Sequence, residues 1–542
     1  MGYSQAKTKP VMIKLKLILL AIFILALSIR LVGLGSIPAS LNRDEAALGY
    51  NAYLLLSTGQ DEWGKSWPIF LQSFGDYKLP GYVMALLPLI HFFGLQDWVV
   101  RFPSALSGSL LILPVYFFAT NFIKRKWLAL TVPYLIAISP VFIFFSRVGF
   151  EANVALLLFM TSLWLLVGGR WKRDLAALVL LFLASITYNT PLFLLPFVAV
   201  FIAGMRGFKN PRKYILPVLG MTLLFVGMMA VLLPVTAQKG SITLLSDETT
   251  WMNWVTFRQS LSDWQKPLLG SRYLYVATQM LSNLWNSFSY SFLVEKGGQH
   301  PWHTLPSFGH VLLSVYVLSL FGILVSIKRT FLIGFLFFNR RIASLKKIEL
   351  EFWLLFLTLA SLVPAIITVD APHATRSLLF FVLLVIWTVI GLERILDLKI
   401  LTLKPLNTTY IQVVLLSLFI ISTSLFSFTY VQAYFSWSKQ EQASWQPGLS
   451  QALRDPAIVS ADKVAILDPE GYAYILVAWY AQLDPKYFLE TIIHQQANAF
   501  GFHYGEQVGK FHFIVNQNDR IPTETATIEW EEAEKKWVVS SY

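Results

Sequence analysis

Long apolar runs separated by short basic clusters form the hydropathy pattern from the N-terminus to about residue 432. Runs of this length and composition are typical of helices that cross a lipid bilayer. The pattern predicts about eleven spans, at residues 12–34, 99–122, 127–146, 150–168, 174–189, 191–206, 214–235, 309–327, 351–368, 376–393 and 409–432. The fold class we expect is therefore mainly α, a polytopic helical bundle in the membrane.

The basic clusters set the orientation, because lysine and arginine accumulate on the cytoplasmic side of membrane proteins. They lie at the N-terminus and at residues 124–126, 170–173, 206–213, 328–347 and 394–404. Placing all of them inside gives a cytoplasmic N-terminus and an extracytoplasmic C-terminus. We expect a multi-pass protein of the plasma (inner) membrane.

One further apolar run, residues 80–95, does not fit this threading. It is short for a span, and Pro80 and Pro88 interrupt it. Counting it as a span would move the basic cluster at 124–126 to the outside. We interpret it as a juxtamembrane or re-entrant helix at the outer face.

The remaining sequence predicts two long outer loops, about 35–98 and 236–308, and a separate C-terminal part. After residue 432 the chain becomes polar, with strand-like runs at 464–467, 511–515 and 537–540 and a buried helix within 472–483. We expect a transmembrane domain at 1–432 and a small soluble extracytoplasmic α/β domain at 433–542.

Composition agrees with a membrane protein and excludes several classes of function. Hydrophobic residues make up 56% of the chain and charged residues 14%, and the mean hydropathy is +0.58. The net charge of +12 lies in the short clusters, which argues against a nucleic-acid partner. Cysteine is absent, so disulfides and thiol chemistry are excluded. We find no phosphate-binding P-loop, no dinucleotide fingerprint, no HExxH and no nucleophile elbow.

Ionisable residues from several separate segments gather on the outer face in this threading. Such groups at membrane depth are costly, so they usually pair or serve function. The set comprises Arg43, Asp44, Glu45, Lys78, Arg101, Arg147, Glu151, His300, His303, Asp370, His373 and Arg376.

Asp44 is the candidate general base. It precedes a predicted helix at 46–56, and an exposed carboxylate is ionised at neutral pH and can accept a proton. The alternative is that Asn42 or Asp44 caps this helix. A cap does not explain the neighbouring Arg43 and Glu45, which we take as supporting residues.

Lys78, Arg101, His373 and Arg376 are candidates for binding a phosphate group, because cationic donors suit a phosphate. For Lys78 and Arg101 the alternative is a side chain that snorkels to the membrane interface.

The remaining candidates for substrate contact are Tyr82, Arg147, Tyr188, His300 and His303. Arg147 and Glu151 are spaced to pair with each other on a helix. No third ligand stands near His300 and His303 at a typical spacing, so we predict no metal site there. The two tyrosines are typical of interface aromatics.

Six motifs stand in order within residues 12–393. They are LNRDEAALGYNAYLL, GDYKLPGYVMALLPLIHFFG, VVRFPSALSGSLLILPVYFFA, SPVFIFFSRVGFEANVALLLF, HPWHTLPSFG and DAPHATRSLLF. Through these motifs the chain resembles the GT-C superfamily of lipid-linked-sugar glycosyltransferases. It looks most similar to the family 39-like group, which includes protein O-mannosyltransferases and lipid A aminoarabinose transferases.

The resemblance implies a catalytic acidic residue at Asp44, a phosphate-contacting lysine at Lys78 and an acidic residue near Glu151, which we take as a further supporting catalytic or acceptor residue. It also implies juxtamembrane helices in the first outer loop and a later loop that covers the site. Two features depart from the family. Lys78 is followed by Leu-Pro rather than Pro-Pro, and no Asp-x-Asp stands near Glu151, which argues against an obligatory metal.

The function we expect is an inverting glycosyltransferase of the outer membrane face. It would move a sugar from a polyprenyl-phosphate donor to an acceptor hydroxyl, with Asp44 as base. The acceptor, the sugar and the carrier length are left open, and so is a divalent metal, although no cofactor is obligatory. The alternatives are a transporter or flippase for a lipid-linked or anionic solute, which would place its charges near the bilayer midplane, and a receptor or scaffold.

Overall fold

The computed structural model describes residues 2–540 except 75, 209, 237–242, 299, 338–345, 398–407, 438–441, 443, 444, 469, 497–502 and 516–524. Contacts divide the chain into two compact units. The helical unit comprises Met1–Ile29, Ser107–Phe144 and Ala155–Val431, and the mixed unit comprises Arg30–Leu106, Phe145–Val154 and Gln432–Tyr542.

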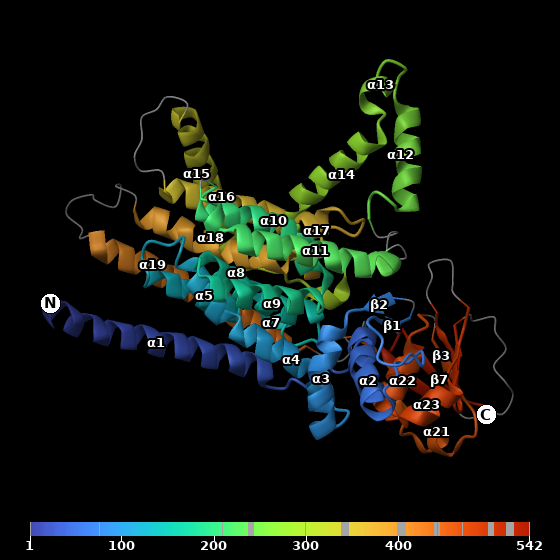
Figure 1. Ribbon diagram of the computed structural model, residues 1–542. Helices are drawn as coiled ribbons and strands as arrows, with labels where there is room; N and C mark the ends of the chain where they lie inside the picture. The colour runs from blue at the N-terminus through green and yellow to red at the C-terminus, as the bar shows by residue number, and fades with distance from the viewer. Residues whose placement is uncertain are drawn as a thin grey trace. The chain divides into compact units, whose positions relative to one another are not determined.

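Every predicted span coincides with a helix or with consecutive helices (Figure 1). In chain order these are α1 Gly2–Leu31, α4 Asp97–Leu110 with α5 Ile112–Ala119, η1 Leu128–Leu130 with α6 Thr131–Ile138 and α7 Pro140–Phe144, α8 Glu151–Val167, α9 Trp171–Ser185, α10 Asn189–Arg206, α11 Ile215–Thr236, α15 Leu313–Phe337, α16 Lys346–Ala360 with α17 Val363–Ile366, α18 Leu378–Leu396 and α19 Thr408–Phe435.

Six segments of the described chain are long and apolar enough to cross a membrane. They are Asp97–Ala119, Asn189–Arg206, Ile215–Leu232, Leu313–Phe331, Thr375–Leu396 and Tyr410–Phe435. The polytopic membrane bundle is therefore confirmed, and the count of eleven spans stays a prediction.

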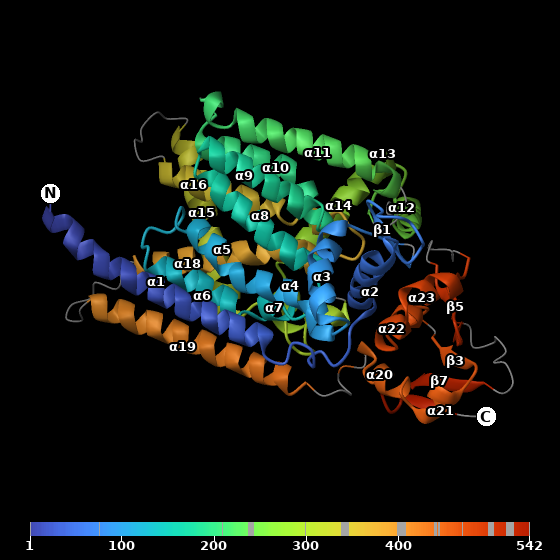
Figure 2. The same cartoon turned by 60° about the horizontal axis from the view of Figure 1, so that its bottom comes forward.

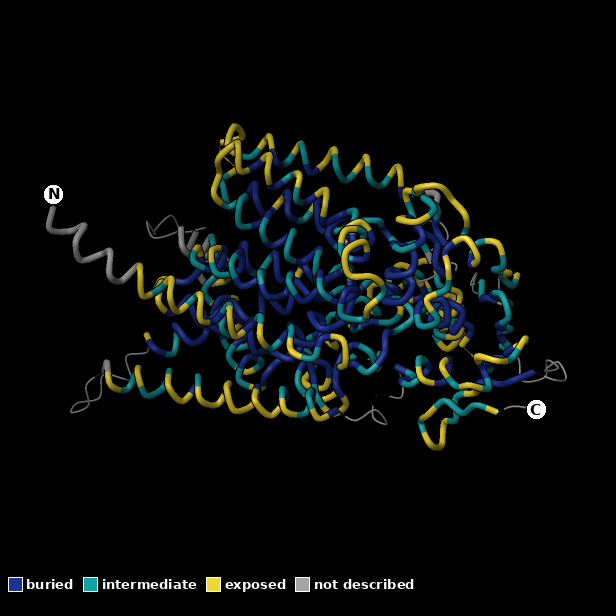
Figure 3. Tube along the Cα trace, turned by 90° about the horizontal axis from the view of Figure 1, so that it is seen from below, coloured by how far each residue is buried: buried dark blue, intermediate teal, exposed yellow. Residues whose placement is uncertain are grey.

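The bundle is built around α18, which is buried along almost its whole length. A Cβ added at Gly391 of α18 would lie 2.3 Å from the Leu318 carbonyl oxygen, and one at Gly322 of α15 would lie 2.4 Å from that of Trp387. Glycine therefore lets the two backbones approach closely, as small residues do between membrane helices. Elsewhere in the helical unit, α9, α10 and α11 lie side by side (Figure 2). Exposed positions run along the outer helices α11 and α19 (Figure 3).

The second long loop contains α12 Glu248–Ser260, α13 Lys266–Leu269, α14 Arg272–Ser287, η4 Ser291–Glu295 and η5 Pro301–His303. The tryptophan-rich stretch around Trp254 is helical, but α12 ends at Ser260 because Leu261 has an extended backbone. Trp264 therefore lies beyond this helix.

The mixed unit combines the first outer loop with the C-terminal part. The loop forms α2 Arg43–Thr58, the hairpin β1 Leu71–Ser73 and β2 Asp76–Lys78, and α3 Pro80–Phe93. The C-terminal part forms a six-stranded sheet in the order β4-β5-β6-β3-β7-β8. Its strands are β3 Val464–Leu467, β4 Ile493–His494, β5 Gly505–Val508, β6 Phe511–Ile514, β7 Ala526–Glu531 and β8 Lys536–Ser540, and its helices are α20 Leu449–Ala452, α21 Pro456–Ser460, α22 Ala473–Tyr480 and α23 Pro485–Thr491. The predicted α/β character of this part is confirmed.

One hydrophobic core joins α2 and α3 to the sheet and its helices. Tyr50 of α2 packs edge-on against Phe488 of α23, with ring centroids 5.0 Å apart. Gly49 of α2 faces the ring of Trp479 in α22. The C-terminal part thus buries its helices against the first outer loop, and the boundary predicted at residue 433 stays untested.

Candidate functional site

Asp44 lies in the first turn of α2, in the mixed unit. The Asn42 side chain caps the helix by accepting from the Glu45 backbone N–H at 2.9 Å, and the Glu45 carboxylate accepts from the Asn42 N–H at 3.1 Å. The residue that caps this helix is therefore Asn42, so the Asp44 carboxylate is not the cap.

The Asp44 carboxylate pairs with Lys78, at the end of β2. Lys78 Nζ lies 2.7 Å from Asp44 Oδ1, and the side chains are 10% and 42% exposed respectively. The carboxylate is thus accessible to an incoming molecule while the ammonium lies mostly within the protein. Arg43 lies over the ring of Tyr472, 3.9 Å from its centroid, and 4.0 Å from the Glu470 carboxylate.

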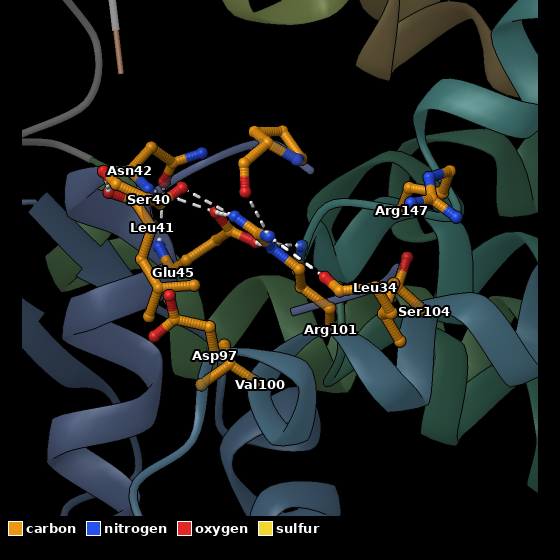
Figure 4. Close-up of polar contacts among 12 residues, drawn as sticks. Leu34, Ser40, Leu41, Asn42, Glu45, Asp97, Val100, Arg101, Ser104 and Arg147 are labelled. Carbon is orange, nitrogen blue, oxygen red and sulfur yellow. Dashed lines mark hydrogen bonds and ion pairs between the residues drawn. The ribbon is translucent and has the colours of Figure 1, made fainter. Parts of the chain in front are cut away.

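Arg101 and Glu45 form a buried ion pair behind this turn (Figure 4). The guanidinium donates to the Glu45 carboxylate, at 2.9 Å from Nε and 3.3 Å from Nη2. It also donates to three carbonyl oxygens, those of Leu34, Pro38 and Ser40. A guanidinium has five N–H groups, and these contacts use all of them. Arg101 was predicted to bind a donor phosphate, but it has no donor left for one.

Glu45 is fully buried, and its carboxylate also accepts from the Gly149 N–H at 2.7 Å. It therefore holds the first turn of α2 against Arg101 and the start of α8, and no substrate can reach it. We correct the expectation that Glu45 supports catalysis directly, because its contacts are those of a positioning residue.

Arg147 is another buried anchor. Its guanidinium donates to four carbonyl oxygens between residues 30 and 37 and lies over the rings of Tyr434 and Phe435. Tyr82 is buried too, and its hydroxyl donates to the Val100 carbonyl at 2.8 Å. These contacts hold segments of the protein together, so neither residue has the exposure that the predicted substrate contact needs. Glu151 begins α8 and is partly exposed.

Glu62 belongs to the first outer loop, between α2 and β1, and the sequence analysis did not identify it as a site residue. Its side chain is fully buried, and burial followed by the charge of Asp61 raises its pKa to about 8. Its backbone N–H donates to the Asn51 side chain of α2 at 2.9 Å. The only signal in the sequence is the adjacent acidic pair Asp61-Glu62, and such a pair is common in exposed polar loops.

A second group of candidates meets in the helical unit. We call it the histidine cluster: His300, His303, Asp370, His373 and Arg376. The three imidazole rings lie 4.9–5.0 Å apart between centroids. Asp370 Oδ2 lies 3.6 Å from His300 Nε2 and 3.5 Å from His373 Nε2, and Arg376 binds Oδ1. Two loops that are far apart in the sequence therefore form one polar site.

Tyr188 lies beside this cluster, because its hydroxyl donates to Thr375 Oγ1 at 3.3 Å. Thr375 in turn bonds His373 Nδ1 at 2.8 Å.

The charge states within the cluster follow from its contacts. Burial opposes ionisation of Asp370, but the nearby His300 imidazole and the charge of Arg376 hold its pKa well below its usual range. Burial and the charge of Arg376 lower the pKa of His373 to about 3. At neutral pH the cluster therefore presents a carboxylate beside a neutral imidazole, a donor set suited to a cation.

Comparison with solved structures identifies the fold. The Archaeoglobus fulgidus oligosaccharyltransferase in its apo form superimposes with a TM-score of 0.50 at 13% identity, over 86% of this chain and 63% of that one. The chain has the GT-C fold. A second structure, of ArnT from Cupriavidus metallidurans bound to undecaprenyl phosphate, gives a TM-score of 0.47 at 12% identity, over 85% of this chain and 84% of that one.

The superposition establishes the GT-C fold, and identities this low support no finer assignment. No protein-family model matches the sequence, and no curated protein matches it either. The chain spans just under two thirds of the length of the archaeal oligosaccharyltransferase. Within its GT-C fold, the Asp44–Lys78 pair belongs to one compact unit and the histidine cluster to the other. The predicted gathering of all these residues in one site stays a prediction.

Proposed function

We propose that the protein transfers a sugar from a polyprenyl-phosphate donor to an acceptor hydroxyl at the outer membrane face. The observation that supports this most directly is the Asp44–Lys78 pair on a GT-C fold. A carboxylate that is 42% exposed lies 2.7 Å from an ammonium. Such a pair offers a proton acceptor beside a group that can bind a phosphate.

In the proposed reaction Asp44 takes the proton of the acceptor hydroxyl as the oxygen attacks the anomeric carbon. A bond forms between that oxygen and the carbon, and the bond from the carbon to the phosphate oxygen breaks. The bonding electrons leave with the lipid phosphate, whose added charge Lys78 stabilises. A single displacement of this kind inverts the anomeric centre. Phosphate is a good leaving group, so one carboxylate base suffices.

The buried contacts behind Asp44 support this assignment. A catalytic group must be held in place by packing and hydrogen bonds around it. The Asn42 cap and the buried Glu45–Arg101 ion pair hold the first turn of α2 in place. Asp44 is then the carboxylate of this turn that remains exposed to a substrate, since Glu45 is buried.

The test is Asp44→Asn, which keeps the shape of the side chain and removes its basicity. We expect turnover to fall by roughly 10²–10⁴-fold, the usual effect of losing a positioned base. Purified protein in lipid nanodiscs is given a panel of polyprenyl-phosphate sugars, and mass spectrometry follows released polyprenyl phosphate and glycosylated acceptor.

The matched control is Asp263→Asn, because Asp263 is an exposed carboxylate that also pairs with a lysine, Lys266. It should leave turnover unchanged. Near-normal turnover of folded Asp44→Asn would remove Asp44 from the mechanism. Movement of the donor lipid or solute across the membrane, with no covalent product, would favour a flippase or transporter instead.

A further inference from the structure

The histidine cluster has the geometry of a metal site. Ligand atoms of His300, Asp370 and His373 all lie within 4.8 Å of one another. The carboxylate oxygen Oδ2 faces both imidazoles, at 3.5 and 3.6 Å. Zinc binds nitrogen and oxygen ligands at about 2.0–2.1 Å, which places neighbouring donor atoms of a tetrahedral site roughly 3.3 Å apart. The distances to Oδ2 exceed this by a few tenths of an ångström, whereas the His300 and His373 rings, whose centroids lie 5.0 Å apart, must move closer together when an ion binds.

The type of donor favours zinc over the alkaline-earth cations. Two imidazoles and one carboxylate match zinc sites that keep an open position, whereas calcium and magnesium prefer oxygen ligands alone. The side chains of His300, Asp370 and His373 are 31%, 24% and 10% exposed. An ion from solution can therefore reach the site, and a water or substrate oxygen can take the fourth position.

Groups around the cluster already orient these ligands. Arg376 holds Asp370 Oδ1, which directs Oδ2 toward the imidazoles. Arg376 also donates to Thr368 Oγ1 at 2.8 Å. Thr375 binds the Nδ1 of His373, so the Nε2 of this ring faces Asp370. Metal sites use outer hydrogen bonds of this kind to fix the tautomer and direction of a histidine ligand.

We propose that His300, Asp370 and His373 bind a zinc ion with one position left open. The site links the loop before η5 to the loop between α17 and η6 (Thr375–Ser377). This proposal departs from our expectation of no metal site at His300 and His303, because two of the three ligands, Asp370 and His373, lie about 70 residues away along the chain. The proposal does not depend on the transferase activity, since zinc binding is measured without a sugar donor.

The experiment measures metal binding by the full chain in nanodiscs. After chelator treatment and reloading, elemental mass spectrometry should find about one zinc ion per wild-type chain. His300→Gln should lower the affinity on the order of 100-fold or more, since the loss of an outer partner alone costs 10–100-fold. Thr375→Val should show that smaller loss. His91→Gln, which removes a single exposed histidine of α3, is the control and should bind zinc as the wild type does.

Cobalt binding by the wild type gives a readout that does not depend on whether a variant folds. Cobalt in a tetrahedral site produces intense visible bands, which zinc should displace. Absence of both zinc binding and these bands in the wild type would overturn the proposal. So would equal zinc affinity in His300→Gln, or tight binding of inorganic phosphate to chelator-treated protein with no added metal.

Discussion

Charged residues of this protein differ in whether they form buried ion pairs or remain accessible at the surface. Asp44 and Glu45 are adjacent in the sequence, yet one is exposed and the other fully buried. The reason is the geometry of α2, in which neighbouring side chains point about 100° apart. Glu45 therefore reaches Arg101 and the Gly149 N–H, while Asp44 reaches Lys78.

Glu62 allows a test of pH dependence at the level of one residue. Its pKa is about 8 in the folded protein, above the ordinary value of 4.5. As pH rises through this window the unfolded chain loses the proton and the folded protein keeps it, so stability falls. The stabilising effect is complete below about pH 4.5 and is lost by about pH 8. In the wild type the free energy of unfolding should fall by on the order of a few kcal/mol across this pH range, and we expect Glu62→Gln to remove that fall.

The measurement is the unfolding temperature between pH 5 and 8, compared between wild type and variant. Glu506→Gln removes an exposed carboxyl of β5 and should follow the wild-type curve. Parallel curves for Glu62→Gln and wild type would show that Glu62 titrates normally in the folded protein.

At the scale of elements, close contact between helices depends on glycine at specific crossings. Gly322 and Gly391 lie where α15 and α18 cross. Gly49 of α2 is also a position of close contact, in this case within the mixed unit. A Cβ there would lie 2.6 Å from the Trp479 ring and 2.8 Å from the Val100 side chain. The junction between the first outer loop and α22 therefore needs a residue without a side chain.

Gly49→Ala should lower the stability of the protein by about 1–3 kcal/mol, the usual cost of overpacking a core. The matched variant is Gly227→Ala in α11, where no described atom lies within 4 Å of an added Cβ. Alanine favours a helix by up to about 1 kcal/mol over glycine, so Gly227→Ala should be neutral or stabilising. Thermal unfolding of both variants in the same nanodiscs checks the opposite signs, and a loss for both would mean that packing at Gly49 is not the cause.

For the whole molecule, the central prediction is the direction in which each loop faces. The basic clusters predict that Lys126 and Arg173 lie inside the cell, and the same threading predicts that Trp264 and Lys486 lie outside. The chain has no cysteine, so single cysteines at these positions report topology without background.

Intact cells treated with a membrane-impermeant maleimide should label Trp264→Cys and Lys486→Cys at once. Lys126→Cys and Arg173→Cys should react only after the membrane is permeabilised. Labelling of Lys126→Cys from outside would mean that α3 spans the membrane, and the second long loop would then lie on the inner face.

The sequence by itself determined the helices of the bundle and the strands β3, β6 and β8. These follow from local apolar runs and from hydrogen bonds between near neighbours in the chain. It also pointed to Asp44 and Lys78, although it did not decide between Asn42 and Asp44 as the helix cap. The GT-C resemblance added the order of the motifs, and the comparison of structures confirmed the fold.

Only the tertiary structure decided which partner each charge has. Glu45 meets Arg101 from 56 residues away, and Arg147 meets carbonyl groups more than a hundred residues away. Residue type alone made both arginines look like substrate contacts. His300 and Asp370 come together in the same way. The physical reason is that ion pairs and metal sites form between segments that packing brings together, and the spacing of residues along the chain does not contain that information.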